Sequence, residues 1–572
     1  MINFKIYIRR YVPKIIRLLR ESIYIDLMRK LGKRTRLLGM KEFPITLYGE
    51  NAFFMHPFKV LNTKNGNKEY FAQFYGEAIA TDYTTSKRGY LTFAAEVLPG
   101  KLIKKPYTFN VEHESLLPVS IVNNKMDGKN ASIKISLDNE KYHLKKLKEN
   151  RFHYIPISGS VKVQPCGNNR CVIGDPINKV QIKKTTKKLV LSIFIDGLAG
   201  SIFDSHSFDK IMPNTSKYFK NGSLYFDGYA SSNWTLPSVA SLFSGLHPIN
   251  HKIYDGANEV TVGENYQVIS EYFSDAGYLT GQICSNFRKN PMYGYMKGFD
   301  RTIYKRNMSC NDVITNALEH LRAFNNRSNF LWLTLFETHH FLHGLPDISI
   351  QSSTDISLHD YSGEKSKSVH SSYSEKQTKL YVEELKRIDF YLKILFDYIK
   401  DQYKDDEVVV SICSDHGKGY IGNPSDMLAE HRIKAPLFFK SSEAQKVEGG
   451  SYACGVDYLP SLLELSDIEF DAKLFDGKSL VNFKRDSSFS ELIFVNDYYR
   501  SAMYTNDHIM KFVSKDKILT ENDIDYNDID YNNGTYSLHT RHDMKTINDS
   551  SNATNRLLLD QYKDFLHNRR RC

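Results

Sequence analysis

The stretch Lys188–Gly197 reads KLVLSIFIDG, and it decides the fold of the larger part of this 572-residue chain. Leu189 to Ile195 form a near-continuous apolar run rich in Val, Ile, Leu and Phe. Such a run is typical of a strand buried on both faces, as in a parallel sheet covered by helices. Asp196 and Gly197 follow directly, at the strand end where open α/β sheets place their ligands. Asp196 can therefore belong to a site, or it can simply cap the next helix.

A second run of the same kind occurs far downstream, where Glu407–Gly417 reads EVVVSICSDHG. Its apolar part leads to Asp415 and His416, again followed by a glycine. Carboxylate and imidazole groups are ligands that zinc and related metals use in proteins. We therefore expect the ends of the two strands to be two halves of one metal site.

Other stretches repeat the rhythm of strand and helix. The segment NFLWLTLFETHH (329–340) predicts another buried strand, with His339 just beyond its end. Apolar residues at helical spacing predict a long amphipathic helix over 375–401. Residues 434–440 predict a further strand, and a further helix starts within 456–465. Strands that alternate with helices predict an α/β fold with a doubly wound, mostly parallel sheet.

The first 43 residues combine many Lys and Arg side chains with Ile, Leu, Phe and Tyr, in a chain of net charge +10. No apolar run there approaches the roughly 18 residues that span a bilayer, and no secretory signal is visible. We expect a basic amphipathic helix that lies on an anionic membrane surface, or one that packs on the protein itself. No nucleic-acid motif accompanies the segment, so nucleic acid is not an expected partner.

The chain divides by composition into further parts. Residues 44–182 hold short alternating runs separated by Asn, Asp, Gly, Lys and Pro, which predict an all-β, sandwich-like domain. The catalytic domain is expected over 188–484. A small sheet and a last helix over 485–572 are expected to complete it. With 41% hydrophobic residues the chain can bury a large core.

The seven cysteines are loosely spaced, and only Cys166 and Cys171 lie close together. That pair can form a small disulfide loop, but the interpretation we favour is ordinary thiols in a reducing compartment. The predicted location is therefore cytoplasmic, with peripheral attachment to the inner membrane face through residues 1–40 as an open alternative.

The third informative stretch is SSNWTLPSVASLFSGLHP (231–248). Pro237 suits a first helical turn, so a helix is predicted from Ser238 with Thr235 at its amino end. Backbone N–H groups at a helix amino end favour an anion. The Thr235 hydroxyl can cap the helix, or it can be a nucleophile activated by a metal.

Taken in order, FIDGL (194–198), TLPSVASLFSG (235–245), KGFD (297–300), SDHG (414–417) and VDYLPSLLEL (456–465) make the chain after Lys188 resemble a known family. It resembles the sulfatase-like branch of the alkaline phosphatase superfamily. The resemblance implies an α/β sandwich with metal and substrate at the carboxyl ends of the strands.

The resemblance also implies roles for six residues of this chain. The implied ligands of one divalent metal ion are Asp196, Thr235, Asp415 and His416. The implied catalytic residues are Thr235 as nucleophile, with His339 and His431 as groups that hold the substrate or protonate the leaving oxygen.

The departures from the family pattern are informative. Sulfatases carry Cys-x-Pro-x-Arg, whose Cys becomes formylglycine, whereas this chain has Thr235, Pro237 and Val239 at those positions. A formylglycine mechanism is therefore excluded. Asp196 is not followed by a second acid, as it tends to be in calcium-binding sulfatases. A threonine nucleophile resembles the phosphodiesterases and the phosphoethanolamine and phosphoglycerol transferases of the superfamily, which implies a covalent phosphothreonine.

Three functions remain open at this point. The first is a metal-dependent phosphoester hydrolase or phospho-group transferase that acts on a phosphodiester or on a phospho-substituted glycan or lipid. The second is a sulfuric ester hydrolase, and the third is a non-catalytic glycan-binding protein. The expected partner is a phosphorylated or sulfated glycan or a lipid-linked substrate. Mixed oxygen and nitrogen ligands favour zinc, with manganese second, over calcium. A second metal at Asp355 and His359 would match a family spacing, but a solvated loop is the simpler interpretation there.

Overall fold

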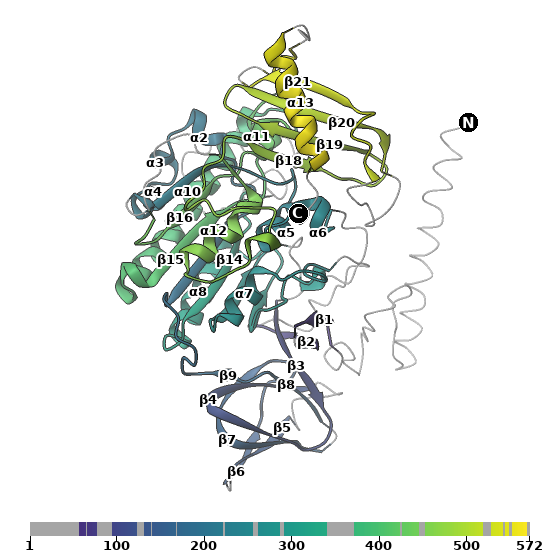
Figure 1. Cartoon of the computed structure of the whole chain (residues 1–572). Coiled ribbons are helices and arrows are strands. Elements are labelled where there is room, and N and C mark those ends of the chain that lie inside the picture. Colours follow the sequence, from purple (N-terminus) through teal and green to yellow (C-terminus); the bar gives the residue numbers. More distant parts are fainter. Residues whose placement is uncertain are drawn as a thin grey trace, which may run out of the picture. The chain divides into compact units, whose positions relative to one another are not determined.

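The computed structural model describes residues 57–64, 66–76, 94–122, 131–138, 140–167, 169–220, 223–254, 261–286, 291–339, 371–423, 426–444, 452–518, 528–541, 544–547 and 552–568. The predicted basic helix over residues 1–43 lies outside this part of the chain, and so do Asp355 and His359. The chain divides into two compact units. One is Met1–Val180 with Asp300–Lys305, and the other is Gln181–Phe299 with Arg306–Cys572 (Figure 1).

The first unit is all-β in its described part, as predicted. Its strands are β1 (Lys59–Thr63), β2 (Gly66–Phe74), β3 (Ala95–Ile103), β4 (Tyr107–Val122), β5 (Ser132–Leu137), β6 (Glu140–Lys145), β7 (His153–Pro165), β8 (Arg170–Gly174), β9 (Ile177–Asn178) and β13 (Arg301–Tyr304). They pair antiparallel, and β3 joins β2 and β13 through its first half and β8 through its second. Alternate residues of β7, such as Val161 and Val163, are buried in a common core.

The second unit is built on a mostly parallel sheet. Parallel strands β12 (Leu279–Cys284), β14 (Asn329–Leu335), β10 (Leu189–Ile195) and β15 (Val408–Cys413) lie side by side in that order. Strand β16 (Leu437–Lys440) pairs antiparallel with β15 and with β11 (Ser223–Tyr229), and β17 (Tyr452–Cys454) is parallel to β11. Every residue of β10, β14 and β15 is buried, so both faces of the sheet are covered.

Two groups of helices supply that cover. Helix α10 (Glu375–Gln402) packs on α4 (Pro213–Phe219) and α8 (Cys310–Ala323), while α5 (Thr235–Ser244) packs on α7 (Ile269–Asp275) and α12 (Tyr458–Leu465). The Ser374 side chain caps α10 by accepting a hydrogen bond from the Gln377 N–H at 3.3 Å. Short helices α2 (Ile202–Ser205), α3 (Phe208–Ile211), α6 (Pro248–His251) and α11 (Glu430–Ile433) lie in the connections. Strand–helix alternation thus confirms the predicted α/β fold.

A second, smaller sheet follows in the same unit. Strands β18 (Ser488–Leu492), β19 (Tyr498–Tyr504), β20 (His508–Lys517) and β21 (Thr535–Thr540) form an antiparallel meander. Helix α13 (Ala553–Asn568) packs on β20 and β21, and Tyr562 and Leu566 are buried in a core with Phe489 and Phe512 (Figure 1).

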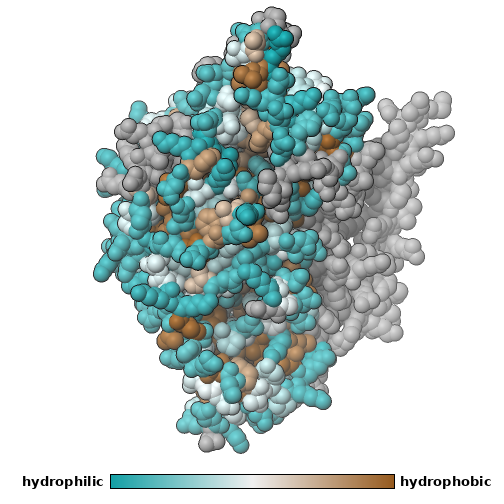
Figure 2. Space-filling model, viewed as in Figure 1, coloured by the Kyte–Doolittle hydropathy of each residue, from teal (hydrophilic) through white to brown (hydrophobic). Residues whose placement is uncertain are grey.

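The surface of the structure is mostly hydrophilic on the face drawn in Figure 2, where hydrophobic residues are scattered among the hydrophilic ones. None of the helices in the described ranges has the length and apolar character that a bilayer crossing requires.

Cys166 and Cys171 are both free thiols, so the alternative of a disulfide between them is wrong.

Candidate active site

The two predicted strand ends meet at one edge of the parallel sheet. Phe194 of β10 pairs with Cys413 of β15, so Asp196 and Asp415 stand at the same level of adjacent strands. Both carboxylates are fully buried. Asp196 caps no helix, because the next one, α2, begins only at Ile202. The alternative interpretation of Asp196 as a helix cap is therefore wrong.

The loop after β10 is held in place by two side chains from other elements. The Gly197 N–H donates to Asp415 Oδ1 at 2.8 Å. The Tyr381 hydroxyl of α10 donates to the Gly197 carbonyl at 2.9 Å and accepts from the Ala199 N–H at 2.8 Å. Gly197 has a φ of +68°, which a glycine adopts without strain. These bonds fix the backbone beside Asp196.

Thr235 is the first residue of α5, which begins three residues earlier than the sequence predicted. Its hydroxyl does not cap the helix, because the N-cap position belongs to Trp234. The hydroxyl oxygen instead lies 3.4 Å from Asp196 Oδ2 and 3.3 Å from His416 Nε2. The threonine hydroxyl is thus directed at the paired strand ends, with the amino end of α5 behind it.

The tautomer of His416 follows from its contacts. Its Nδ1 lies 2.8 Å from the Gly417 carbonyl, which can only accept, so Nδ1 carries the hydrogen. In a neutral imidazole Nε2 then holds a lone pair. Nε2 is 3.2 Å from Asp415 Oδ2, a buried oxygen that accepts no hydrogen bond from the described residues. Two lone-pair atoms this close and this buried need a cation or a proton between them.

Asp196, Asp415 and His416, the acid–histidine cluster, form a group that can hold a metal ion. One ligand atom from each lies within 4.8 Å of those of the other two, and all three residues are buried. Two carboxylates and one imidazole make a mixed oxygen and nitrogen ligand set. The residues therefore fit a divalent ion, and the Thr235 hydroxyl lies within reach as a further ligand.

Several neighbours of the cluster escaped the sequence analysis. The Asn286 amide donates to Asp196 Oδ2, and the Thr338 hydroxyl donates to the Asp196 carbonyl. Both follow strand ends of the same sheet edge, since β12 ends at Cys284 and β14 ends at Leu335. That position was a usable signal, whereas nothing in the sequence marks Tyr381 within the long helix α10.

Lys418 is a buried cation beside the cluster. Its ammonium and the adjoining methylene lie only 2.3 Å from where a Cβ on Gly197 would stand. Burial lowers the pKa of Lys418, and the carboxylates of Asp196 and Asp415 oppose that shift. The Lys418 side chain therefore occupies space that any side chain at position 197 would fill.

The two predicted catalytic histidines are located differently. His339 lies four residues beyond β14, and its ring stacks on Phe336 with 4.4 Å between the centroids. His431 is joined to the cluster through its backbone, because its carbonyl accepts from the Lys418 N–H at 3.0 Å. Burial, aided by Arg432, lowers the pKa of His431 to about 4, so its ring is neutral at pH 7. Its Nε2 is buried and makes no hydrogen bond within the described ranges.

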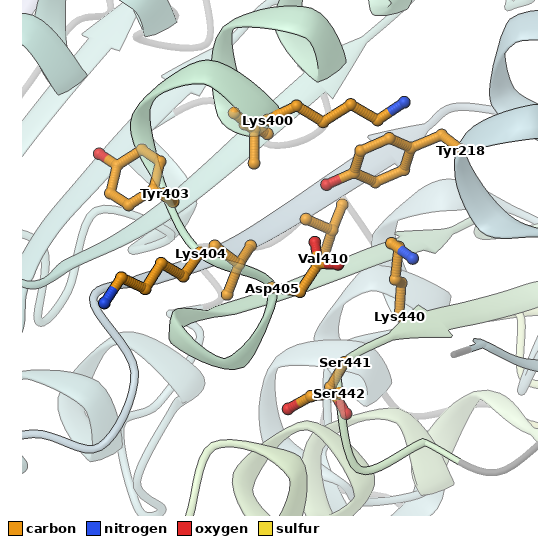
Figure 3. A pocket seen from close by; sticks show the side chains of 11 residues that line it. Tyr218, Lys400, Tyr403, Lys404, Asp405, Val410, Lys440, Ser441 and Ser442 are labelled. Carbon is orange, nitrogen blue, oxygen red and sulfur yellow. The ribbon is translucent and has the colours of Figure 1, made fainter. Parts of the chain in front are cut away.

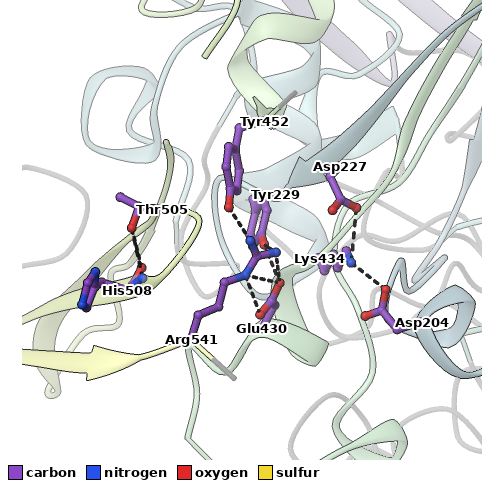
Figure 4. A network of polar contacts seen from close by, with 9 residues as sticks. All are labelled: Asp204, Asp227, Tyr229, Glu430, Lys434, Tyr452, Thr505, His508 and Arg541. Atoms are coloured by element: carbon purple, nitrogen blue, oxygen red, sulfur yellow. Dashed lines mark hydrogen bonds and ion pairs between the residues drawn. The ribbon is translucent and has the colours of Figure 1, made fainter. Parts of the chain in front are cut away.

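A polar network holds the segment that carries His431 (Figure 4). Arg541, just after β21, donates to Glu430 from Nη2 at 2.7 Å and from Nε at 3.2 Å. The Tyr229 hydroxyl donates to the same carboxylate at 2.5 Å and accepts from Arg541 at 2.9 Å. Nearby, Lys434 bridges two acids, at 2.8 Å to Asp204 and 3.3 Å to Asp227. The C-terminal sheet therefore helps to position helix α11.

Comparisons with known proteins agree with the fold. The sulfatase family model matches residues 188–468. No curated protein matches the sequence. A phosphonate monoester hydrolase from Silicibacter pomeroyi has a TM-score of 0.50 and 14% identity, over 66% of this chain and 95% of that one. A Bacteroides thetaiotaomicron protein from a locus for glycosaminoglycan metabolism has a TM-score of 0.51 and 12% identity, over 68% and 96%. At such identities these two structures show a common fold.

Proposed function

Because residues 188–468 are a sulfatase-family domain, this chain is an enzyme of the alkaline phosphatase superfamily, and we propose that it acts on a phosphoester through Thr235. The substrate class is a phosphodiester, or a phospho-substituted glycan or lipid. The observation that carries the proposal is the approach of the Thr235 hydroxyl to Asp196 at 3.4 Å and to His416 at 3.3 Å.

A threonine at this position supports phosphoryl chemistry for a chemical reason. Formylglycine forms from cysteine, and residue 235 is not a cysteine. A secondary alcohol can still attack phosphorus when its pKa is lowered, and the amino end of α5 favours the negative charge of the attacked group. The Silicibacter pomeroyi structure with this fold belongs to a phosphonate monoester hydrolase, an enzyme that also cleaves an ester bond at phosphorus.

The proposed reaction has two halves. In the first, the Thr235 hydroxyl gives its proton to Asp196, the carboxylate that accepts its hydrogen bond, and Oγ1 forms a bond to phosphorus. The bond to the leaving oxygen breaks, and His339 protonates that oxygen. His431 is the weaker candidate for this proton, because a ring with a pKa of about 4 is neutral at pH 7. In the second half His339 takes a proton from water while the water oxygen attacks phosphorus, and the bond to Oγ1 breaks as Thr235 regains its proton from Asp196. This gives hydrolysis, whereas a sugar hydroxyl in place of water would give transfer.

The metal ion belongs to the same proposal. We assign its ligands as Asp196, Asp415, His416 and the Thr235 hydroxyl. A bound divalent ion would lower the pKa of that hydroxyl and offset negative charge on the transferred group. The imidazole nitrogen favours zinc, with manganese second, over calcium. Lys418 contributes a buried positive charge on the Gly197 side of the site.

Mass spectrometry of the Thr235 peptide tests the nucleophile. After a brief exposure to bis(4-nitrophenyl) phosphate and an acid quench, we expect a 4-nitrophenyl phosphate diester on the wild-type peptide and on Thr235→Ser, because one nitrophenolate leaves and the other stays on phosphorus. We expect none on Thr235→Val, which keeps the side-chain shape but lacks the hydroxyl. Equal turnover by Thr235→Val and wild type would end the proposal.

A sulfuric ester hydrolase acting on a sulfated glycan is the second candidate. It is favoured by the family match, since the matched model is that of the sulfatases. Parallel assays with 4-nitrophenyl sulfate and with the phosphodiester distinguish the two, and faster turnover of the sulfate would favour this candidate. Family membership and the buried ligand cluster together disfavour the third alternative, a non-catalytic glycan-binding protein.

The location and the membrane contact stay predictions from the sequence. We propose a cytoplasmic enzyme that meets a glycan or lipid-linked substrate at the inner membrane face through residues 1–40. Deleting those residues should lower the fraction of protein that sediments with anionic vesicles. Unchanged sedimentation of the deleted protein would remove the membrane contact from the proposal.

A further inference from the structure

A pocket lies at the end of β15 that is opposite to the active site (Figure 3). It is lined by the start of β15 at Val408 and Val410, by the end of α10 at Lys400, and by Tyr218 and Lys440. Strand β15 runs from this pocket toward Asp415, which is seven residues beyond Val408. At about 3.3 Å per residue the two sites are roughly 20 Å apart. The pocket is therefore distinct from the acid–histidine cluster.

The tyrosine in this pocket lies close to two positive charges. Phe396 stacks on the Tyr218 ring with 4.1 Å between centroids and 9° between planes, so one face is covered. The ammonium groups of Lys400 and Lys440 lie 5.3 Å and 5.4 Å from the ring centroid. In the view of Figure 3 the Lys400 ammonium is drawn above the Tyr218 ring and the Lys440 ammonium below it. Two like charges are thereby held around one small space.

The two ammonium groups repel each other, and Asp405 offsets part of that repulsion. Burial lowers the pKa of Lys440, and of the two charged neighbours Asp405 opposes this shift while Lys400 adds to it. The Lys400 ammonium makes no ion pair or hydrogen bond with any residue of the described ranges, only the contact with the Tyr218 ring. An anion between the two ammonium groups would relieve their repulsion.

Two hydroxyl groups complete the set of donors. The Tyr218 side chain is only 5% exposed, yet its hydroxyl makes no hydrogen bond within the part of the chain that is described. In Figure 3 this hydroxyl is directed toward the middle of the pocket. Ser441 is 3% exposed; its oxygen accepts from the Ala444 N–H at 3.0 Å, and its hydrogen meets no acceptor among the described residues. The Tyr218 hydroxyl oxygen is not one of the fully enclosed, unpaired polar atoms of the described ranges, so it is open to the pocket and can donate to a ligand there.

We propose that this pocket binds a tetrahedral oxyanion, the phosphate or sulfate group of a free ion or of an ester. Lys400 and Lys440 neutralise its charge, and the hydroxyl groups of Tyr218 and Ser441 donate hydrogen bonds to its oxygens. The cavity of about 130 Å³ is roughly ten times what one water molecule needs, which leaves room for the anion and part of an attached group. Asp405 is the one acid among the described lining residues, and its negative charge weakens anion binding.

Equilibrium dialysis of the full-length protein against radiolabelled phosphate tests the proposal. The parent protein and all variants carry Asp415→Asn, which removes the metal site. Phosphate bound in the active site should therefore add the same small amount to the binding measured for each of them. We expect the double variant Lys400→Met/Lys440→Met to bind at least ten-fold more weakly, and Tyr218→Phe several-fold more weakly. Asp405→Asn should bind several-fold more tightly. The matched control is Lys393→Met, which removes an α10 lysine that pairs with Asp397 and should change nothing.

The outcomes separate specific binding from charge alone. Equal affinity in the double variant and its parent, or an equal loss with Lys393→Met, would overturn the proposal. If the double variant does not fold, the opposite shifts of Tyr218→Phe and Asp405→Asn carry the test. Competition by sulfate and by glucose 6-phosphate, but not by glucose, would support the site. If glucose 6-phosphate competes more strongly than unlabelled phosphate, the anion that the pocket binds belongs to an ester.

Discussion

Arg541 and Glu430 form a two-pronged ion pair, with Nη2 to Oε1 at 2.7 Å and Nε to Oε2 at 3.4 Å. Glu430 opens the short helix α11, and the carbonyls of the next two residues, His431 and Arg432, accept from the N–H groups of Lys418 and Gly417 at 3.0 Å and 2.7 Å. The C-terminal sheet is therefore connected to His416 through one side-chain pair and two backbone bonds.

Arg541→Met should destabilise the protein and weaken the metal site. The pair is partly exposed, so the expected loss of unfolding free energy is about 1–3 kcal/mol. Burial would raise the pKa of Glu430, but the hydrogen bonds from Arg541 and Tyr229 outweigh it and the pKa is lowered. A carboxyl with a lowered folded-state pKa stabilises above its unfolded pKa, and that contribution disappears as the pH falls through the folded value. The difference in unfolding free energy between wild type and Arg541→Met should therefore become smaller as the pH falls.

Urea unfolding at pH 7 and pH 4, with metal titration at pH 7, measures both effects. Arg500→Met is a matched control, because Arg500 forms an ion pair of similar length in the same sheet, at 2.8 Å to Asp497. An equal loss of metal affinity in Arg500→Met, or a stability deficit of Arg541→Met that grows as the pH falls, would contradict the proposed link.

Asp415→Asn should abolish stoichiometric metal binding while the fold remains. The substitution removes one of two buried negative charges, which a divalent ion needs, but its amide oxygen can still accept from the Gly197 N–H. We expect metal affinity to fall by at least 100-fold, with little change in the melting temperature of the metal-free protein. Elemental analysis and calorimetric titration with zinc and manganese provide the measurement. Full zinc content in the variant would show that the ion binds elsewhere.

Gly417→Ala should displace His416. A Cβ at this glycine would stand 2.1 Å from the His431 carbonyl oxygen, which is backbone and cannot rotate away. We expect a loss of about 1–3 kcal/mol in unfolding free energy, typical of overpacking, together with weaker metal binding. Gly455→Ala is the control, since its nearest neighbour is the Ser231 hydroxyl oxygen at 3.0 Å, a side-chain atom that can move. Equal effects of the two substitutions would argue against a specific role for the 417–431 contact.

His251 should make the protein less stable in mild acid. Its Nδ1 accepts from the Ile253 N–H at 3.0 Å, and its Nε2 lies 3.1 Å from the Pro237 carbonyl in α5. Burial lowers its pKa to about 3, against about 6.5 when unfolded. The unfolded chain takes up the proton first, so stability falls by about 1.4 kcal/mol per pH unit below pH 6.5 from this group.

The comparison of wild type with His251→Gln checks this slope, because glutamine does not titrate. Urea unfolding between pH 7 and pH 5 should give a steeper decline for wild type than for the variant. Parallel lines would mean that His251 does not carry the proton uptake.

Much of this site was accessible from local sequence pattern. The apolar runs that end at Asp196 and at Asp415 predicted buried parallel strands, and ligands gather at the carboxyl ends of such strands. Pro237 predicted the amino end of α5, although the helix begins at Thr235 and not at Ser238. Tyr381 and Arg541 carry no such signal, because their partners are 184 and 111 residues away in the chain.

The sequence by itself determined the element types, because apolar periodicity and turn residues act over a few neighbouring positions. It also determined the chemistry available at the strand ends: two acids, an imidazole and a hydroxyl in place of a thiol. Only the tertiary structure decided which groups meet. The pairing of Phe194 with Cys413 sets Asp196 level with Asp415, and a register slip would separate them. Packing likewise directs the Lys418 ammonium into the space above Gly197, since the distances between atoms depend on the fold as a whole.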